Sequence, residues 1–179
     1  LLGQAFFASP AERSITMVKI DLKGQVKEFE NNVTAAEVAK SIGAGLYKSA
    51  CAARIDGVVC DLRTPIDHDC ALDILTFDTE DGKRAYWHTT SHILAQAMMR
   101  LYPGTKFSIG PAIENGFYYD FDLQEPISTE DLAKIEDEMK KIIKENLPIE
   151  RFELPVEEAK KLMEGQDYKE ELIDEHAGQ

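Results

Sequence analysis

Residues 17–42 read MVKIDLKGQVKEFENNVTAAEVAKSI, and the order of patterns in this stretch decides the fold. Residues 18–22 alternate apolar and polar side chains, which is typical of a half-buried strand. Lys23-Gly24 supplies a turn, and Val26 and Phe29 fit an antiparallel return strand. The sequence therefore predicts a β-hairpin at the beginning of the fold.

A capping box follows the hairpin. In Thr34-Ala35-Ala36-Glu37 the hydroxyl and the carboxylate are placed to satisfy the first amides of a helix. We expect that helix to bury Val38 and Ile42 and to end near Gly43 and Gly45.

Further strands complete this first module. Residues 53–55 and 58–60 flank Asp56-Gly57, a strong hairpin signal, and residues 72–77 fit a closing strand. Two strands, a helix and more strands within about 60 residues predict a small α+β roll.

A polar stretch at residues 79–84 fits a domain boundary. A helix is predicted over about 88–101, with an apolar stripe on one face. Two strands, residues 108–113 and 117–122, are expected next, joined by Asn115-Gly116 in a type I′ turn.

The second of these strands is rich in aromatic side chains. Alternation places Phe117, Tyr119 and Phe121 on one face and leaves the opposite face more polar. The aromatic cluster fits either core packing or the wall of a pocket. Pro111 in the preceding strand indicates an edge position or a bulge.

Helices dominate the remainder. A long helix is predicted from Ser128 to about Asn146, followed by shorter ones near residues 155–164 and 167–175. The residues expected to face inward from the long helix are Leu132, Ile135, Met139, Ile142 and Ile143.

Composition narrows the functional class. The 179 residues contain 20 Lys and Arg against 33 Asp and Glu, a net charge of −13, which disfavours a stand-alone nucleic-acid binder and a DNA partner. No apolar run approaches the length of a membrane-spanning helix. The three cysteines are interpreted as buried, reduced thiols.

His88-Thr89-Thr90-Ser91-His92 places two imidazoles one helical turn apart. That spacing suits shared metal ligation or a pair that positions a water, and it also fits two exposed histidines without a function. Thr89 occupies the position where a zinc protease needs Glu, which excludes that class. Lys169 alone reads as a surface lysine.

Four segments together resemble the N-terminal portion of bacterial threonyl-tRNA synthetases. They are residues 88–92, residues 101–106 (LYPGTK), residues 109–120 (IGPAIENGFYYD) and Tyr168-Lys169.

The resemblance assigns two domains and implies an α+β fold class. Residues 17–78 resemble the TGS domain, a small ubiquitin-like β-grasp module. Residues 79–179 resemble the first part of the α+β editing domain, and residues 1–16 are unassigned.

The resemblance implies that the parent enzyme uses ATP to attach threonine to tRNA(Thr), and that this region hydrolyses serine attached to that tRNA by mistake. Serine lacks only one methyl group of threonine. One methyl discriminates by roughly 10- to 200-fold, so a second, hydrolytic selection is needed.

Site residues follow from the matching motifs. His88 is expected to orient or deprotonate the attacking water, with help from Lys169, and His92 to hold the terminal ribose or its water. Lys169 is also placed to stabilise the developing oxyanion.

The same resemblance implies a pocket. Tyr119 lines it, Gly110 and Pro111 shape its wall, and Asp120 is a further substrate-binding candidate.

The family completes this site with a Cys-x-x-x-His motif that the 179 residues do not contain, so we expect a truncated editing domain. No cofactor or metal is expected in these residues. ATP, magnesium and zinc are implied for a catalytic domain outside them, as is homodimerisation of the parent enzyme. The expected location is the cytoplasm, without membrane contact.

Two alternatives remain open. One is a stand-alone editing factor that depends on a metal held by His88 and His92. The other is a non-enzymatic regulatory or interaction module built on residues 17–78.

Overall fold

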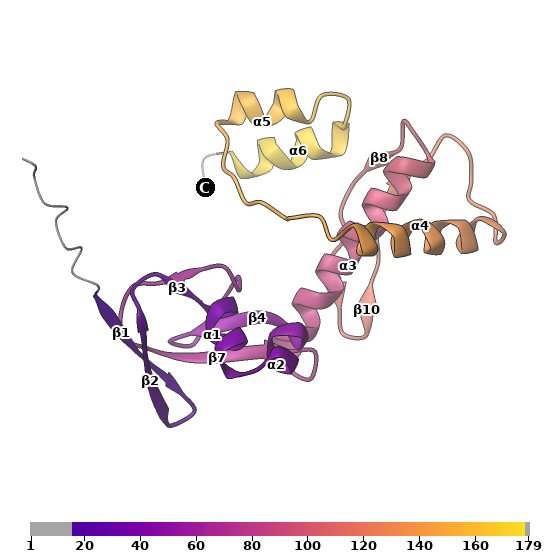
Figure 1. Ribbon diagram of the computed structural model, residues 1–179. Helices are drawn as coiled ribbons and strands as arrows, with labels where there is room; N and C mark the ends of the chain where they lie inside the picture. The colour runs from indigo at the N-terminus through magenta and orange to yellow at the C-terminus, as the bar shows by residue number, and fades with distance from the viewer. Residues whose placement is uncertain (1–15, 178–179) are drawn as a thin grey trace, which may run out of the picture. The chain divides into compact units, whose positions relative to one another are not determined.

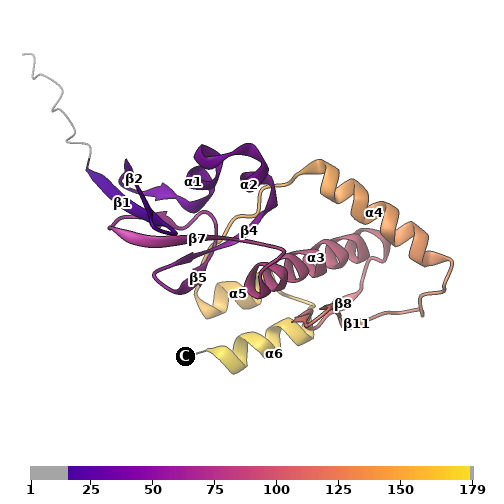
Figure 2. The same ribbon diagram turned by 90° about the horizontal axis from the view of Figure 1, so that it is seen from below.

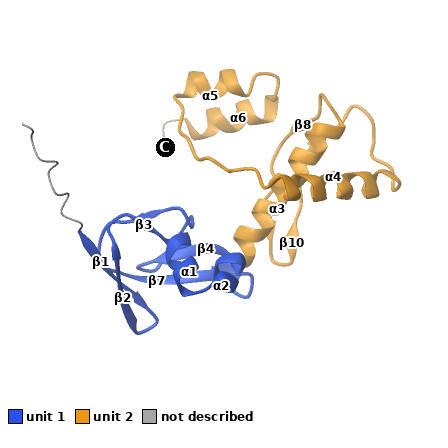
Figure 3. Ribbon diagram, viewed as in Figure 1, with its two compact units in different colours: residues 1–82 blue, residues 83–179 orange. Residues whose placement is uncertain are grey.

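The computed structural model describes residues 16–177, so nearly all of the unassigned segment 1–16 lies outside the described residues. The chain divides into two compact units, unit 1 up to Gly82 and unit 2 from Lys83 onward (Figure 1, Figure 3). Each unit is described by itself.

Unit 1 is built on a five-stranded mixed sheet. The strand order is β2-β1-β7-β4-β5, in which β1 and β7 run parallel and every other pair is antiparallel. The strands are β1 (Met17–Leu22), β2 (Gln25–Glu30), β4 (Ala50–Ile55), β5 (Val58–Cys60) and β7 (Cys70–Thr76). A two-stranded pair, β3 (Val33–Thr34) with β6 (Pro65–Ile66), lies outside this sheet.

Both predicted hairpins of unit 1 are confirmed, and the same turn chemistry closes them. Leu22 pairs with Gln25 and Ile55 with Val58, so two residues remain at the centre of each turn. Those residues are Lys23-Gly24 and Asp56-Gly57, all four with positive φ. Positive φ at both central positions is what a type I′ turn requires.

Two helices cover one side of this sheet, α1 (Ala35–Ile42) and α2 (Ala44–Ser49) (Figure 2). The capping box is confirmed: the Thr34 hydroxyl accepts a hydrogen bond from the Glu37 amide, and the Glu37 carboxylate accepts one from the Thr34 amide. Val38 is fully buried as predicted, whereas Ile42 is 43% exposed, because it lies at the end of α1 beyond the packed core.

The core of unit 1 joins α1 to the sheet. Its buried members are Val18, Ile20, Ala35, Val38, Ala53, Ile66, Cys70 and Leu72. A helix packed on a mixed sheet whose first strand lies parallel to its last confirms the predicted α+β class and its β-grasp module.

The long helix α3 (Glu80–Leu101) begins eight residues earlier than predicted. The polar stretch that reads as a boundary is its first turn: the Thr79 hydroxyl accepts a hydrogen bond from the Gly82 amide at 3.1 Å. Glu80 and Asp81 in that turn are favourable to the helix dipole. The unit boundary therefore falls within a continuous helix.

The two long strands predicted in unit 2 are four short ones. β8 (Lys106–Phe107) pairs with β11 (Phe121–Asp122), and β9 (Ala112–Ile113) pairs with β10 (Gly116–Phe117). The break falls at Pro111, which has no amide to donate to the ladder.

The hairpin between β9 and β10 differs from the prediction in its turn. Ile113 pairs with Gly116, so Glu114 and Asn115 occupy the centre, and neither has positive φ. The expected type I′ turn at Asn115-Gly116 is therefore wrong by one residue.

Three helices follow: α4 (Asp131–Glu145), α5 (Val156–Leu162) and α6 (Asp167–His176). Ile135 and Ile142 of α4 are buried as predicted, but Leu132 and Ile143 are more than half exposed. The core of unit 2 gathers Met98 of α3, Phe107 of β8 and Ile135 of α4.

Two composition-based expectations have a structural counterpart. Cys51, Cys60 and Cys70 are all unpaired, although only Cys70 is buried. Among residues 16–177, no helix is both long enough and apolar enough to cross a bilayer.

Candidate active site

The site predicted in unit 2 begins with the two histidines of α3. One helical turn separates His88 from His92, which brings their Nε2 atoms to 3.2 Å and their ring centroids to 4.6 Å. The rings meet edge to face, at 75°. One ring nitrogen donates to the other, so at least one of the two Nε2 atoms is unprotonated in this contact. Both side chains are accessible from solvent.

The surroundings of His92 disfavour the charged form of its ring. Burial of the ring lowers its pKa, and the neighbouring His88 and the charge of Lys169 lower it further. A neutral imidazole donates from one ring nitrogen and accepts at the other, so His92 can hold a water beside His88 by donating to its oxygen.

Ser91 connects the histidine helix to the loop that precedes β9. Its side chain is fully buried, and its Oγ lies 2.8 Å from the carbonyl oxygens of both His88 and Gly110. Sequence reasoning missed this residue, although a signal existed. Ser91 precedes Met98 by seven residues and so shares the buried stripe of α3, where a polar side chain requires a partner.

Gly110 and Tyr119 fit together as parts of one wall. A Cβ atom at position 110 would overlap the Tyr119 ring, so only glycine allows this approach. The ring in turn stacks on Phe121 with centroids 4.6 Å apart and planes 3° apart. Burial raises the pKa of the Tyr119 hydroxyl. Tyr119 and Phe121 share one aromatic face as predicted, whereas Phe117 belongs to the separate strand β10 and lies against Trp87 instead. Tyr119 is fixed by its neighbours on both sides.

Lys169 reaches the same loop from α6. Its Nζ donates to the Ser108 carbonyl at 2.6 Å, a contact between residues 61 positions apart. Burial lowers the pKa of this ammonium group. The charge of Lys169 also contributes to the lowered pKa of His92.

Gln166 holds α6 against β8. Its Oε1 accepts from the Phe107 amide at 2.9 Å and its Nε2 donates to the Thr105 carbonyl at 3.1 Å. Asp167 adds an ion pair with Lys106. Figure 2 shows α6 beside β8 and β11. The sequence carries no local signal for Gln166, since both partners lie about 60 residues earlier.

The structure brings most of the predicted site residues together. His88 contacts His92, and Ser91 between them bonds to the Gly110 carbonyl. Lys169 bonds to the Ser108 carbonyl in the same loop, and Tyr119 packs on Gly110. Pro111 is next to Gly110 and is half-buried.

Asp120 differs from the other predicted site residues. It pairs through its backbone with Ser108 and Ile109, while its side chain is exposed. No contact among the described residues links the Asp120 carboxylate to the histidines.

The histidine pair has no third protein ligand for a metal ion nearby among the described residues. Among the described residues 16–177, no group of three or more His, Cys, Asp and Glu side chains is arranged to hold an ion. His88 and His92 alone supply two nitrogens.

Comparison with known proteins agrees with both units. Residues 20–76 match the model of the TGS domain. Over 160 residues, 88% of the chain, it is 60% identical to the threonine–tRNA ligase of Acetivibrio thermocellus and 58% identical to that of Clostridium acetobutylicum. The corresponding ligase of Clostridioides difficile is 55% identical over the same share of the chain.

The chain spans about a quarter of the length of these curated relatives. It contains a TGS domain, and its relatives are aminoacyl-tRNA synthetases named threonine–tRNA ligase. The resemblance drawn from the four sequence segments is thereby confirmed.

Proposed function

We propose that unit 2 contributes to an editing site that hydrolyses serine from mischarged tRNA(Thr). The observation that carries the proposal is the pair of histidines with Nε2 atoms 3.2 Å apart, beside a partly buried lysine. This arrangement supplies a proton acceptor, a proton donor and a positive charge within one small region.

The substrate is an ester, and water is the nucleophile. A water that enters between the two rings would replace their direct contact, donating to Nε2 of His88 and accepting from Nε2–H of His92. His88 takes the proton as the water oxygen bonds to the ester carbon. The bond from that carbon to the ribose oxygen then breaks, and the proton passes to the ribose oxygen. The products are free serine and uncharged tRNA.

Lys169 would act on the charge that develops during this step. The carbonyl oxygen becomes an oxyanion when water adds, and a desolvated ammonium group stabilises that charge more strongly than a hydrated one. Its hydrogen bond to the Ser108 carbonyl fixes the position of the ammonium group in advance.

Selection of serine over threonine would depend on the wall made by Gly110 and Tyr119. The wall cannot move easily, because Tyr119 is held between Gly110 and Phe121. A rigid wall excludes one additional methyl group more effectively than a flexible one does. Exclusion of threonine from the editing site would complement the selection of threonine during attachment, because one methyl group alone does not discriminate enough.

The activity of the whole ligase belongs to the same proposal. The complete enzyme would attach threonine to tRNA(Thr) in the cytoplasm with ATP, magnesium and a zinc ion held by a separate catalytic domain. tRNA(Thr) would then be the shared partner of attachment and editing.

The test uses the threonine–tRNA ligase that carries this sequence. Ser-tRNA(Thr) and Thr-tRNA(Thr) are each incubated with the enzyme, and release of the amino acid is followed over time. His88→Ala is expected to slow release of serine by roughly 100-fold or more, the typical contribution of a general base. His176→Ala is the matched control, because His176 is an exposed histidine on α6 whose Nδ1 bonds to the Leu172 carbonyl of its own helix.

Threonine attachment by His88→Ala should be unchanged, and Ser-tRNA(Thr) should accumulate during attachment assays that contain serine. Serine release at the normal rate by His88→Ala would overturn the assignment of this site.

A further inference from the structure

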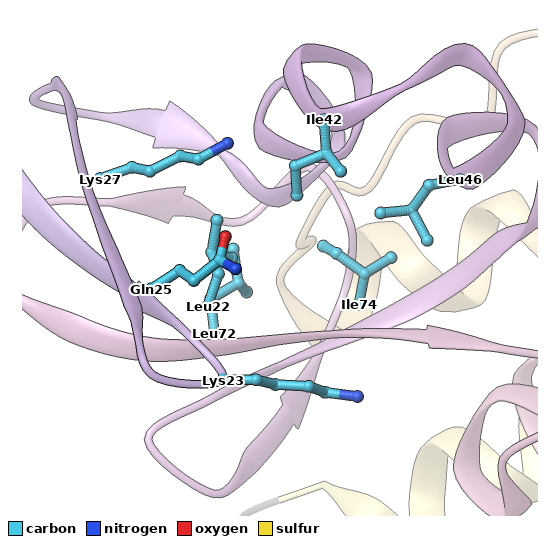
Figure 4. Close-up of a pocket in the computed structure, with 8 residues that line it drawn as sticks. All are labelled: Leu22, Lys23, Gln25, Lys27, Ile42, Leu46, Leu72 and Ile74. Carbon is cyan, nitrogen blue, oxygen red and sulfur yellow. The ribbon is translucent and has the colours of Figure 1, made fainter.

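Unit 1 contains a pocket that the proposed editing reaction does not use. Its volume is about 330 Å³, within the range of sites that bind small molecules. The pocket lies between the β1–β2 hairpin, strand β7 and the two helices. Its lining residues are Leu22, Lys23, Gln25, Lys27, Ile42, Leu46, Leu72 and Ile74 (Figure 4).

The interior of this pocket is apolar. Leu72 is almost completely buried and continues into the core of unit 1. Leu22, Leu46 and Ile74 are half-buried, and Ile42 is 43% exposed at the end of α1. The helical spacing that predicts Ile42 to be buried is therefore explained, because Ile42 faces the pocket instead of the closed core.

The opening of the pocket is positively charged. Lys27 pairs with Ile20 and Gln25 with Leu22, so both side chains emerge on the face of the hairpin that the apolar residues occupy. Lys23 lies in the turn between them. Among the described residues, neither ammonium group makes an ion pair.

The acidic residues of this hairpin point elsewhere. Glu28 and Glu30 alternate with Lys27 along β2 and so lie on the opposite face. Asp21 accepts a hydrogen bond from the Gly24 amide at 2.6 Å, which commits its carboxylate to the turn. The chain has a net charge of −13, so two lysines without an ion pair at the edge of an apolar cavity make this part of the surface locally positive.

We infer that this pocket binds a small amphiphilic anion, a molecule with a compact apolar body and one carboxylate or phosphate group. The apolar body would occupy the space beside Leu72, and the anion would lie at the opening, within reach of Lys27 or Lys23, with Gln25 as a further donor. Burial of the apolar part supplies affinity, while the two ammonium groups select for charge.

The site is independent of the editing proposal, since all its residues belong to unit 1. Loss of serine editing in His88→Ala would leave this pocket intact. Conversely, failure to bind an anion here would have no bearing on the histidine site.

Octanoate is the probe, because it combines a flexible apolar chain with a carboxylate. The full chain is labelled at its Leu and Ile methyl groups and titrated with octanoate by NMR. Saturable shifts are expected for the methyl groups of the five apolar lining residues. Acetate, which lacks the apolar body, and octanol, which lacks the charge, should each bind at least five-fold more weakly.

Three variants test the role of charge. Lys23→Gln and Lys27→Gln should each weaken octanoate binding by roughly two- to five-fold, as expected for an exposed charge pair. Lys19→Gln is the matched control, because Lys19 pairs with Glu28 on the opposite face of the same hairpin. The inference is overturned if octanoate leaves these methyl groups unshifted, if octanol binds as tightly, or if Lys19→Gln weakens binding as much.

Discussion

The two units differ in how far apart along the sequence their informative contacts lie. In unit 1, each hairpin closes between residues three positions apart, Leu22 with Gln25 and Ile55 with Val58. In unit 2, the site depends on contacts such as Lys169 to Ser108, 61 positions apart. Local patterns therefore report the hairpins and the capped helix of unit 1, although its sheet is closed by β1 pairing with β7, Ile20 with Cys70. The candidate site of unit 2 depends on long-range packing.

The largest effect is expected from a substitution that disrupts the long-range packing of unit 2. Gly110→Ala places a methyl group against the Tyr119 ring, so the ring must move from its stack on Phe121. We expect the free energy of unfolding of unit 2 to fall by about 1 to 3 kcal/mol, the usual cost of overpacking. Hydrogen exchange of unit 2 amides measures it.

Gly45→Ala in α2 is the control in unit 1. Nothing lies within 4 Å of a Cβ atom at that position. Alanine is favoured over glycine in a helix, so stability should rise by about 0.4 to 1 kcal/mol. A comparable loss at both positions would show that Gly110 has no special packing role.

A smaller effect is expected from Ser91→Ala. The substitution removes the hydroxyl that bonds to the carbonyl oxygens of His88 and Gly110, and it leaves the part-buried Gly110 oxygen without this donor. The expected cost is roughly 1 to 2 kcal/mol. Denaturant unfolding measures it. Ser49→Ala, whose exposed hydroxyl bonds only within its own helix, should cost less than about 0.5 kcal/mol.

In unit 1, the informative substitution is one that removes a local interaction at the start of a helix. Thr34→Ala removes the capping interaction with the Glu37 amide, and we expect a loss of about 1 kcal/mol in the stability of unit 1 alone. Thr90→Ala is the control, since the Thr90 hydroxyl bonds to the Tyr86 carbonyl within a helix interior. If Thr34→Ala leaves exchange in α1 unchanged, the capping box has no role in stability.

The smallest effect concerns pH, and it has opposite signs in the two units. Hydrogen bonds to Asp67 and Asp56 raise the pKa of His68 above its usual 6.5, whereas burial lowers the pKa of His92 below that value. The His68 contribution is present below about pH 6.5 and is lost as the pH rises through its raised pKa. The His92 ring opposes folding as the pH falls from about 6.5 through its lowered pKa.

NMR titration of the ring protons measures these two values directly. His68 should titrate above 6.5 and His92 below it. The reverse order would contradict the contacts assigned to both rings.

The sequence predicts unit 1 almost completely, because its signals are local. Turn dipeptides, a capping box and alternation each report on residues within a few positions of one another. The exceptions are helix α2, the β3–β6 pair and Ile42. No element is predicted for α2 or for the pair, and the helical spacing of Ile42 does not reveal that the helix ends beside a pocket.

In unit 2 the resemblance supplies candidate residues, whereas local patterns miss much of the geometry. The candidates are His88, His92, Tyr119 and Lys169; Tyr119, Lys169 and the histidine helix all contact the loop of residues 108–110. Gln166 has no local signal, and the early start of α3 is missed because Thr79 caps a stretch whose polarity resembles a linker. Asp120 belongs to the same motif, but it precedes β11 and its side chain is exposed.

The most direct test of the central claim asks whether the histidine pair and Lys169 act as one site. Rates of Ser-tRNA(Thr) hydrolysis are measured for the ligase that carries this sequence, as wild type, His88→Ala, Lys169→Met and the double variant. Groups that act together in one step give strongly non-additive losses. We predict that the rate of the double variant lies within about three-fold of the rate of the slower single variant. A double variant whose loss equals the product of the two single losses would show that the two residues act independently, and would contradict a single editing site assembled across 61 positions of the chain.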